Sequence, residues 1–564
     1  MIRSQIIWSV VAAAVSGLLT SLGFPKDLTT HSAFAWVLPI ALIPLLVAIE
    51  LLPTTYQPPS RTHSTTTRPV TAFTRGLEAF ALIWLFGAVL IGFAFHWVTV
   101  PAVLFGELTP AVSYSLFLLY CVLAGLYFTI IFFPVIWNAA RCSKRSLSQF
   151  PVWCLVVTVA SLESLLPRIF HWTFGNLMFG SLPVVQWASL IGSSGLSVLV
   201  FASNFYLVRA LTERPRNPGR LSLVVASVGA GWLCVVFVGN RLLNQTHEME
   251  KNARTTHVGF VQPNFGFEGL PRNKQYSKQL ELQSLSSLMK LTEEMVISTD
   301  GEKLDLIVWP ESAAPYNFGW SESLKREVLQ KIQEWNSPLL AQAIEFNKEE
   351  AESLGQHNAT IYSVSFLLKT DGSQSQSFKK WLPIPFGESI PFEDSFPWLG
   401  DLVRNNVRNI SKLGRGTTFD ALAYTAWDAV APLICFDAIS SDLTRAQSTQ
   451  GNGTLYVNQA NFLWMWKSQA ALQFTQLGRF RAIENRRSFI LSSNTGPSVA
   501  ISPSGEFMST PLPLIHRGYL KAKLPVLEVQ TPYARYGNTP LLFLGSIAAA
   551  TLIFMSRPRI RNSA

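Results

Sequence analysis

The chain has 564 residues, of which 49% are hydrophobic and only 14% are charged, and its formal net charge is +10. Charged residues make up about a quarter of an ordinary soluble chain, so this composition argues against a wholly soluble protein, and its hydrophobicity excludes an intrinsically disordered one. Residues 1–240 carry 13 Lys and Arg and 6 Asp and Glu, whereas residues 241–564 carry 32 and 29. The first part therefore has the composition of a membrane protein, and most of the second part that of a soluble domain.

Apolar runs long enough to cross a bilayer, which takes about 20 residues in a helix, recur along the chain. They lie at 6–24, 32–52, 77–99, 111–137, 149–166, 184–208, 221–240 and 540–555. We therefore expect a polytopic α-helical membrane bundle of about eight spans. Seven helices would lie in residues 1–240, and the eighth span would lie with a basic cytoplasmic tail in residues 540–564.

Basic residues concentrate in alternate loops of this bundle. Those after the second, fourth and sixth runs and in the tail are Arg61, Arg68, Arg75, Arg141, Lys144, Arg145, Arg209, Arg214, Arg216, Arg220, Arg557, Arg559 and Arg561. The opposite loops hold only Lys26 and Arg168. The positive-inside rule then places both termini in the cytoplasm and residues 241–539 on the outer side. The excess positive charge is thus explained by membrane orientation and headgroup contact, and it does not indicate a nucleic-acid partner.

Residues 241–539 alternate short apolar segments with polar ones, which is typical of an α/β domain with a buried sheet. Strands are predicted at 257–262, 304–309, 359–368, 431–435, 454–459, 489–493 and 499–502, and a helix at 468–487. We expect one external α/β domain over 241–539, with its core at about 255–525.

Cys435 is the only cysteine in this predicted external domain. It ends an apolar segment, where a side chain is held rigidly at the edge of a sheet. Glu311 follows another predicted strand, and Lys380 precedes the segment Pro-Ile-Pro-Phe-Gly-Glu. A carboxylate can take the thiol proton, and an ammonium group can stabilise an oxyanion, so these three residues would make a nucleophilic site.

Three motifs resemble the Glu-Lys-Cys signature of the nitrilase superfamily. They are W-P-E at 309–311, K-x4-P-F-G-E at 380–388 and I-C-F-D at 434–437. With apolar runs before and after them, nearly the whole chain resembles the apolipoprotein N-acyltransferase family. This resemblance implies that the external domain is an αββα sandwich of the nitrilase type. It also implies a multi-pass protein of the bacterial inner membrane whose catalytic domain faces the periplasm.

The resemblance further implies the roles of the site residues. Cys435 would attack the ester of a phospholipid and form a thioester, with Glu311 as the general base and Lys380 stabilising the oxyanion. The acyl group would then pass to the α-amino group of the diacylglyceryl-modified N-terminal cysteine of an apolipoprotein, in a ping-pong mechanism. The supporting residues would be Glu388, Asp437, Phe436 and Asn358. The partners would be membrane lipids and the apolipoprotein, and no sequence motif indicates a metal or other cofactor.

The chain departs from the family pattern at several positions. Gln262-Pro263-Asn264 stands where the family usually has Gln-Gly-Asn, Cys435-Phe436-Asp437 stands for Cys-Tyr-Glu, and residues 458–462 lack the usual Asp and Trp. Pro383 replaces a leucine, and counting back from that leucine would choose Lys379. The preceding aromatic residue and the spacing to P-F-G-E choose Lys380. Two other functions stay open, namely a membrane-bound amidohydrolase with the same three residues and a non-enzymatic lipid-binding scaffold.

Overall fold

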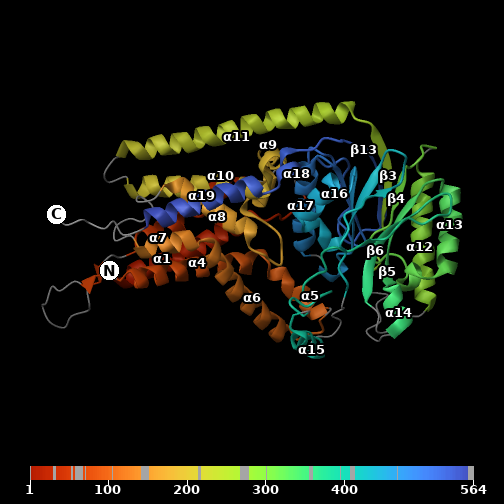
Figure 1. The fold of residues 1–564 in the computed structure, drawn as a ribbon, viewed down its shortest axis with the longest axis horizontal. Coiled ribbons are helices and arrows are strands. Elements are labelled where there is room, and N and C mark those ends of the chain that lie inside the picture. The colour runs from red at the N-terminus through yellow and green to blue at the C-terminus, as the bar shows by residue number, and fades with distance from the viewer. Residues whose placement is uncertain are drawn as a thin grey trace.

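The structure is a computed structural model of the chain, shown as a ribbon in Figure 1. It describes residues 2–28, 33–52, 55–56, 68–69, 71–104, 106–141, 151–213, 218–266, 278–299, 301–354, 360–393, 395–406, 413–465 and 468–556. Several basic residues used above for orientation lie outside the described residues: Arg61, Lys144, Arg145, Arg214, Arg216, Arg557, Arg559 and Arg561.

The first part of the chain is helical. Its helices are α1 (Ile2–Ser21), η1 (Ala33–Val37), α2 (Leu38–Ala41), α3 (Ile43–Glu50), α4 (Ala72–Ala94), η2 (His96–Val98), α5 (Thr99–Leu104), α6 (Pro110–Ile131), α7 (Phe133–Arg141), α8 (Val152–Leu165), η4 (Phe174–Gly180), α9 (Leu182–Val185), α10 (Ala188–Glu213) and α11 (Pro218–Asn252). Two short strands, β1 (Thr55–Tyr56) and β2 (Arg68–Pro69), pair between α3 and α4. A further apolar helix, α19 (Thr539–Met555), returns and packs along α8.

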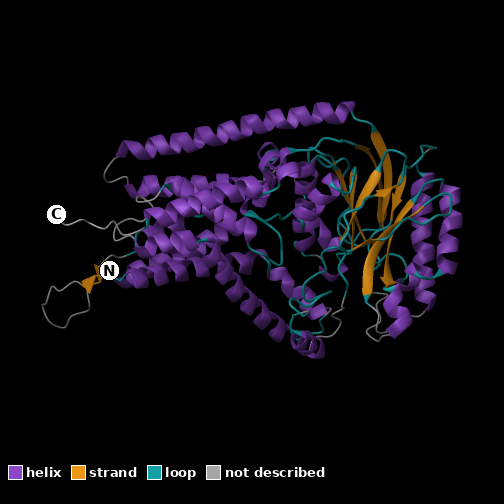
Figure 2. Cartoon of the chain, in the orientation of Figure 1, coloured by secondary structure: helices purple, strands orange, loops and turns teal. Residues whose placement is uncertain are grey.

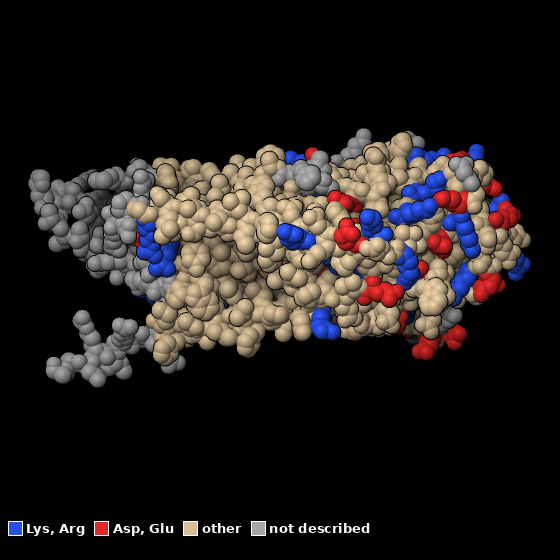
Figure 3. Space-filling model, turned by 90° about the horizontal axis from the view of Figure 1, so that it is seen from above, with Lys and Arg blue, Asp and Glu red and all other residues tan. Residues whose placement is uncertain are grey.

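Within the part of the chain that the structure describes, five helical segments are long and apolar enough to cross a membrane: Ala33–Glu50, Phe73–Ala94, Pro110–Ile131, Ala188–Glu213 and Gly219–Asn252. Three apolar helices are shorter: Gln5–Ser21, Val152–Leu165 and Thr539–Met555. Figure 3 shows a broad tan band over this part, with few charged residues between a group of basic residues at one end and the mixed charges at the other. The structure therefore has a membrane-type helical part joined to a charged domain.

Close helix contacts hold this bundle together. Helix α4 packs against α1, α6 and α7. Gly87 of α4 faces Phe128 of α6, where a Cβ atom would lie 2.4 Å from the Phe128 ring. Small residues at such contacts let apolar helices approach closely, and dispersion contacts then stabilise the bundle. Helix α1 begins and α19 ends at the end of the bundle that lies far from the sheets (Figure 1).

The second part contains two stacked sheets. One has the strand order β13-β3-β4-β5-β6-β7, with bounds Gly518–Pro525, Thr255–Gln262, Leu306–Val308, Leu339–Phe346, Ile361–Leu368 and Phe378–Lys379. The other has the order β12-β11-β10-β9-β8, with bounds Val499–Ile501, Ser488–Ser493, Leu455–Ala460, Ala429–Ile434 and Leu422–Ala423. The pairs β3–β4, β4–β5, β9–β10 and β10–β11 are parallel.

Helices cover the outer face of each sheet, which makes four layers (Figure 2). One outer layer holds α12 (Lys278–Ile297) and α13 (Glu322–Trp335), with α14 (Lys348–Leu354) nearby. The other holds α16 (Ser441–Thr449) and α17 (Ala470–Asn485). Alternate residues of a strand face opposite layers: Val258 and Phe260 of β3 belong to the core between the sheets, whereas Val261 belongs to the core under the helices.

The layer of α17 is buried against the membrane helices. Phe436 and Phe474 from the α/β part share one continuous hydrophobic core with residues such as Phe95 and Trp172. The remaining elements are η6 (Tyr316–Gly319), α15 (Pro397–Asn406), η8 (Cys435–Ile439), η9 (Leu463–Met465) and α18 (Pro532–Tyr536). The two parts of the chain are thus joined by packing as well as by the peptide chain.

The strands predicted from sequence are present within a few residues of the expected bounds. The strand predicted at 431–435 lies at Ala429–Ile434, so Cys435 does not end the strand but begins the 3-10 helix that follows it. Strands β5 and β13 were not predicted. Strand β13 alternates apolar and polar residues from Leu520 to Leu524, so the sequence does carry a strand signal there, whereas the apolar residues of β5 are interrupted by Gln342 and Glu345. The two strands pair with β3 and β6.

Candidate active site

Glu311 lies just beyond the carboxyl end of β4. The strand residues Leu306–Val308 are fully buried, and the chain then turns through Trp309 and Pro310. The Trp309 indole donates to Thr292 Oγ1 at 2.9 Å, and the Ser312 amide donates to Gln342 Oε1 at 2.8 Å. These bonds on both sides of Glu311 fix the direction of its carboxylate.

Lys380 follows strand β7 and is completely buried. Its amide donates to the Ser363 carbonyl at 2.8 Å, so it continues the pairing of β7 with β6. Its Nζ atom lies 3.4 Å from Glu311 Oε1 and 2.7 Å from Glu388 Oε1. The preceding residue, Lys379, is exposed and places its Nζ 3.9 Å from the centre of the Tyr362 ring. Because neighbouring residues of a strand point to opposite faces, Lys380 and not Lys379 reaches Glu311.

Cys435 begins η8 at the carboxyl end of β9 and is almost completely buried. Its φ angle is +49°, a left-handed conformation that is costly for a residue with a Cβ atom. The thiol donates a hydrogen bond to the Glu311 carboxylate.

The three residues come from different segments and meet in a buried site, so their charges act on each other. Burial raises the pKa of the Glu311 carboxyl, and the positive charge of Lys380 opposes this effect. Burial, together with the negative charge of Glu311, raises the pKa of the Cys435 thiol well above its ordinary value. Burial alone would lower the pKa of Lys380, but Glu388 and Glu311 outweigh it and raise the pKa. The resting site therefore holds a protonated thiol beside a carboxylate that is a stronger base than usual, and a charged lysine.

Glu388 binds both the side chain of Lys380 and the backbone of the loop that follows Lys380. While Oε1 binds Lys380, Oε2 accepts from the Ile384 amide at 2.8 Å. The Glu388 carbonyl also accepts from the Leu413 amide at 2.9 Å. The carboxylate thus holds the lysine and shapes the segment around it.

Asp437 is completely buried two residues after the thiol. Its carboxylate accepts from the amides of Leu382 at 2.7 Å, Ile434 at 3.0 Å and Trp381 at 3.1 Å. Burial raises its pKa to about 6. Asp437 therefore clamps the segment after Lys380 to the strand end that carries Cys435, and its ligands are backbone amides rather than an ion-pair partner.

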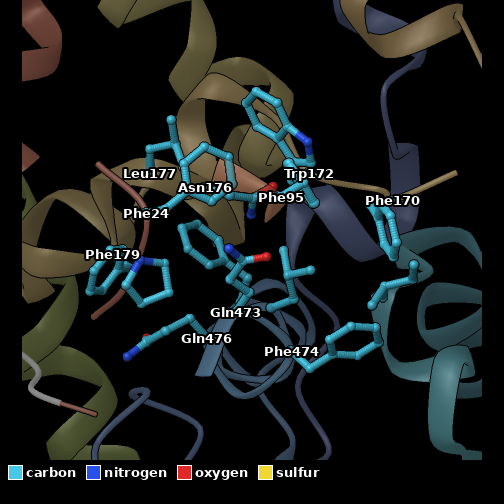
Figure 4. Close-up of a pocket in the computed structure, with 14 residues that line it drawn as sticks. Phe24, Phe95, Phe170, Trp172, Asn176, Leu177, Phe179, Gln473, Phe474 and Gln476 are labelled. Atoms are coloured by element: carbon cyan, nitrogen blue, oxygen red, sulfur yellow. The ribbon is translucent and has the colours of Figure 1, made fainter. Parts of the chain in front are cut away.

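Phe436 joins the site to the membrane part. Its ring centre lies 5.9 Å from that of Phe170, in the loop after α8, and 5.6 Å from that of Phe474 in α17. Beside them is a cavity between the two parts of the chain (Figure 4). Its lining residues are Phe24, Pro25, Phe95, Phe170, Trp172, Asn176, Leu177, Phe179, Ile439, Gln473, Phe474, Gln476, Leu477 and Phe480.

Asn358, the remaining supporting residue expected from the sequence, lies outside the described residues. Two residues near the site were not singled out from the sequence. The Asn461 backbone amide hydrogen-bonds the Cys435 sulfur, and the Gln459 side chain donates to the Trp309 carbonyl at 2.7 Å across the two sheets. The first contact follows from β10 pairing beside β9 and the second from the stacking of the two sheets, and no local sequence signal reveals either. Among the described residues, no group of three or more His, Cys, Asp or Glu side chains could hold a metal ion.

Known protein families match the helical part and the α/β part of the chain separately. Residues 16–206 match the family described as "Apolipoprotein N-acyltransferase N-terminal domain", and residues 275–531 match "Carbon-nitrogen hydrolase". The apolipoprotein N-acyltransferase of Chlorobaculum tepidum is 25% identical over 97% of this chain and 96% of its own. That of Geobacter metallireducens is 26% identical over 93% and 91%.

Among solved structures, the chain is similar to an amidase from Nesterenkonia sp., with a TM-score of 0.36 and 14% identity over 51% of this chain and 96% of that one. These values are too low to support any statement about function. The two family matches lie in the expected order, and the relatives cover nearly the full length of both chains. Over nearly its full length the chain therefore resembles the apolipoprotein N-acyltransferases, with the N-terminal domain of that family in its first part and a carbon-nitrogen hydrolase domain in its second part.

Proposed function

We propose that this protein transfers a fatty acyl group from a membrane phospholipid to the α-amino group of the lipid-modified N-terminal cysteine of apolipoproteins. The similarity to apolipoprotein N-acyltransferases over nearly the whole chain supports the N-acylation of lipoproteins. One geometric observation supports the chemistry: the thiol of Cys435, the carboxylate of Glu311 and the ammonium group of Lys380 converge in one buried place.

The first half-reaction forms an acyl-enzyme. Glu311 takes the proton of the Cys435 thiol as the sulfur attacks the ester carbonyl carbon, because the raised pKa of Glu311 makes it an effective base. The carbonyl oxygen becomes an oxyanion, which Lys380 stabilises. The oxyanion then collapses, and the lysophospholipid alcohol leaves with the proton from Glu311. The product is a thioester on Cys435.

The second half-reaction uses the same groups in the reverse direction. The α-amino group of the acceptor attacks the thioester carbon, and Glu311 takes a proton from the attacking nitrogen. Lys380 again stabilises the oxyanion, and Cys435 leaves and regains a proton from Glu311. The net result is an amide and a free thiol, as expected of a ping-pong mechanism.

The membrane placement forms part of the proposal. Residues 1–240 would hold seven spans, residues 241–539 the catalytic domain, and residues 540–564 the eighth span and a cytoplasmic tail. Both termini would lie in the cytoplasm of a bacterium, and the catalytic domain would face outward from the inner membrane. This topology is supported by the alternating basic loops. It is also supported by the start of α1 and the end of α19, which both lie at the end of the bundle remote from the sheets (Figure 1). Protease added outside spheroplasts should cut the catalytic domain and spare the termini.

The chemistry can be tested by mass spectrometry of the purified full-length protein reconstituted with phospholipid. We expect Cys435 to gain the mass of one acyl group, and a diacylglyceryl-modified peptide with a free amino terminus to remove it. The same peptide with an acetylated amino terminus is the control and should leave the thioester intact. Acyl transfer by a Cys435→Ala variant would contradict the proposal.

The other two functions predict different outcomes in the same experiment. A membrane-bound amidohydrolase would release ammonia from small amides and would not acylate the peptide. A lipid-binding scaffold would bind phospholipid without any covalent change at Cys435.

A further inference from the structure

The turn Pro503–Glu506, which follows strand β12, is held by groups from several elements. The Pro503 carbonyl accepts from Arg486 Nη1 at 3.0 Å, and the Gly505 carbonyl from Arg479 Nε at 2.5 Å. Between them, the Ser504 carbonyl accepts from Gln186 Nε2 at 2.8 Å. Three consecutive carbonyls of the catalytic domain are therefore bound by side chains, and one of these side chains comes from the membrane part.

Both arginines also bind the membrane part directly. Arg486 donates to Gln186 Oε1 at 2.8 Å and to Ser189 Oγ at 3.2 Å. Arg479 donates to the Phe179 carbonyl at 3.0 Å. Both guanidinium groups are nearly completely buried, and burial lowers the pKa of each to about 10. A buried cation is costly unless polar partners surround it, so these bonds strongly favour one arrangement of the two parts.

An acidic residue of helix α11 binds the same turn from another side. Glu250 accepts from the Ser504 amide at 2.7 Å.

Helix α17 is bound to the membrane part at other points as well. Gln473 donates to the Ala94 carbonyl at 2.9 Å, and Glu484 accepts from the Ser193 amide at 3.3 Å. The helix is thus attached to the membrane helices at several positions along its length.

The other contacts of α17 lead to the nucleophile. Helix α17 packs against η8, the 3-10 helix that begins at Cys435. The Phe474 ring of α17 contacts Phe436, the residue that follows the thiol. A displacement of α17 relative to the membrane part would therefore move the thiol with it.

We propose that Arg479 and Arg486 are positioning residues that fix the height and orientation of the catalytic domain over the bilayer. In this arrangement Cys435 is held where the ester of a membrane-embedded lipid can reach it. The inference rests on the proposed function, because it concerns delivery of that lipid to that thiol. Arg479 and Arg486 touch no reacting atom and act through α17 and η8.

Arg487 provides a matched control in the neighbouring position. It is as buried as Arg486, but its partners are the carbonyls of Gly453, Asn485, Arg486 and Val529, none of which belongs to the helical membrane part. Loss of Arg487 would disturb the catalytic domain itself. Loss of Arg486 would in addition remove the hydrogen bonds to Gln186 and Ser189 of the membrane part.

The experiment compares two acyl donors with the full-length protein in nanodiscs of dialkyl ether phospholipid, which contains no acyl ester. One donor is a long-chain diacyl phospholipid within the disc, and the other is dibutanoyl phosphatidylcholine dissolved in the buffer. The initial rate of Cys435 acylation is measured for each by mass spectrometry. The ratio of the two rates reports positioning over the bilayer, and it does not depend on the fraction of protein that is folded.

We expect Arg486→Gln to lower this ratio about tenfold, equivalent to roughly 1.4 kcal/mol, because small displacements of reacting groups are costly. Arg487→Gln should leave the ratio within about twofold of the wild type even if both rates fall. Gln186→Ala, which alters only the membrane side and leaves the catalytic domain intact, should lower the ratio in the same direction as Arg486→Gln.

An equal fall of both rates in Arg486→Gln, or an unchanged ratio in Gln186→Ala, would overturn the positioning role while leaving the proposed function in place. Absence of acylation of the wild type by either donor would overturn the proposed function and this inference with it. Should Arg486→Gln fail to fold, the Gln186→Ala ratio decides the question alone.

Discussion

The ammonium group of Lys380 and the carboxylate of Glu311 lie 3.4 Å apart, with side chains that are 0% and 10% exposed. The two residues are 69 positions apart in the chain. Burying either charged side chain is costly, and only the other charged groups of the site offset that cost. Buried ion pairs contribute little net stability. Their presence here is better explained by the chemistry of the adjacent thiol.

The two adjacent lysines should differ sharply in function. Lys380→Met removes the cation next to Glu311, and we expect the rate of Cys435 acylation to fall about 10²- to 10³-fold through loss of oxyanion stabilisation. Lys379→Met removes only a contact with the Tyr362 ring, worth about 0.5–1 kcal/mol, and should leave the rate within about twofold. Single-turnover acylation measured by mass spectrometry distinguishes them. Similar losses in both variants would contradict the assignment of Lys380.

Glu388→Gln should slow acylation while preserving the local fold. The amide can still accept from Ile384, but it no longer carries the charge that binds Lys380 at 2.7 Å. We expect the acylation rate to fall about tenfold to hundredfold, or roughly 1.4–2.8 kcal/mol. Glu393→Gln, in the same loop and bonded to the Ile390 amide, is the matched control and should retain nearly the full rate. Equal effects of the two changes would argue against a special role for Glu388.

Asp437 should produce a pH dependence near 6, because burial raises its pKa from 3.8 to about 6. Since the folded-state pKa is raised, its contribution to stability is largest below pH 3.8 and is lost as the pH rises through about 6. Activity should change in the opposite direction, because only the carboxylate accepts all three amide hydrogen bonds. We expect the wild-type acylation rate to rise through pH 6 and Asp437→Asn to lack this step. Identical pH profiles between pH 5 and 8 would contradict this prediction.

Gly505→Ala should destabilise the protein more than Gly372→Ala. Both glycines have positive φ angles, +87° and +86°, so an alanine is strained at either position by about 1–2 kcal/mol. At Gly505 a Cβ atom would also lie 2.5 Å from Ile483 Cδ1, whereas at Gly372 it would meet no atom within 4 Å. Overpacking adds about 1–3 kcal/mol. Thermal unfolding in detergent should therefore show the lower midpoint for Gly505→Ala, and an equal shift in both variants would contradict the close contact.

The parts of this site that could be predicted from sequence are those that follow from a local pattern. The W-P-E, P-F-G-E and I-C-F-D motifs each follow or precede an apolar segment, so Glu311, Lys380 and Cys435 could be expected at sheet edges. The contact between the Asn461 amide and the thiol could not be predicted from the sequence, because it depends on β10 pairing beside β9. The role of Asp437 was equally hidden, since two of its three backbone-amide partners are 55 and 56 residues away.

The class of the protein and its reactive groups follow from the amino-acid sequence alone. Composition and apolar runs depend only on which residues are present and in what order, so a helical membrane part, an α/β domain and a lone thiol beside a carboxylate and a lysine could be predicted from it. The sequence favours Lys380 over Lys379, but the physical reason lies in the tertiary structure, because strand pairing sets the direction in which each side chain points. The tertiary structure also decided how the two parts are joined, because the partners of Arg479 and Arg486 lie about 300 residues away in the chain. Contacts at that separation arise from packing of whole elements, which no local pattern records.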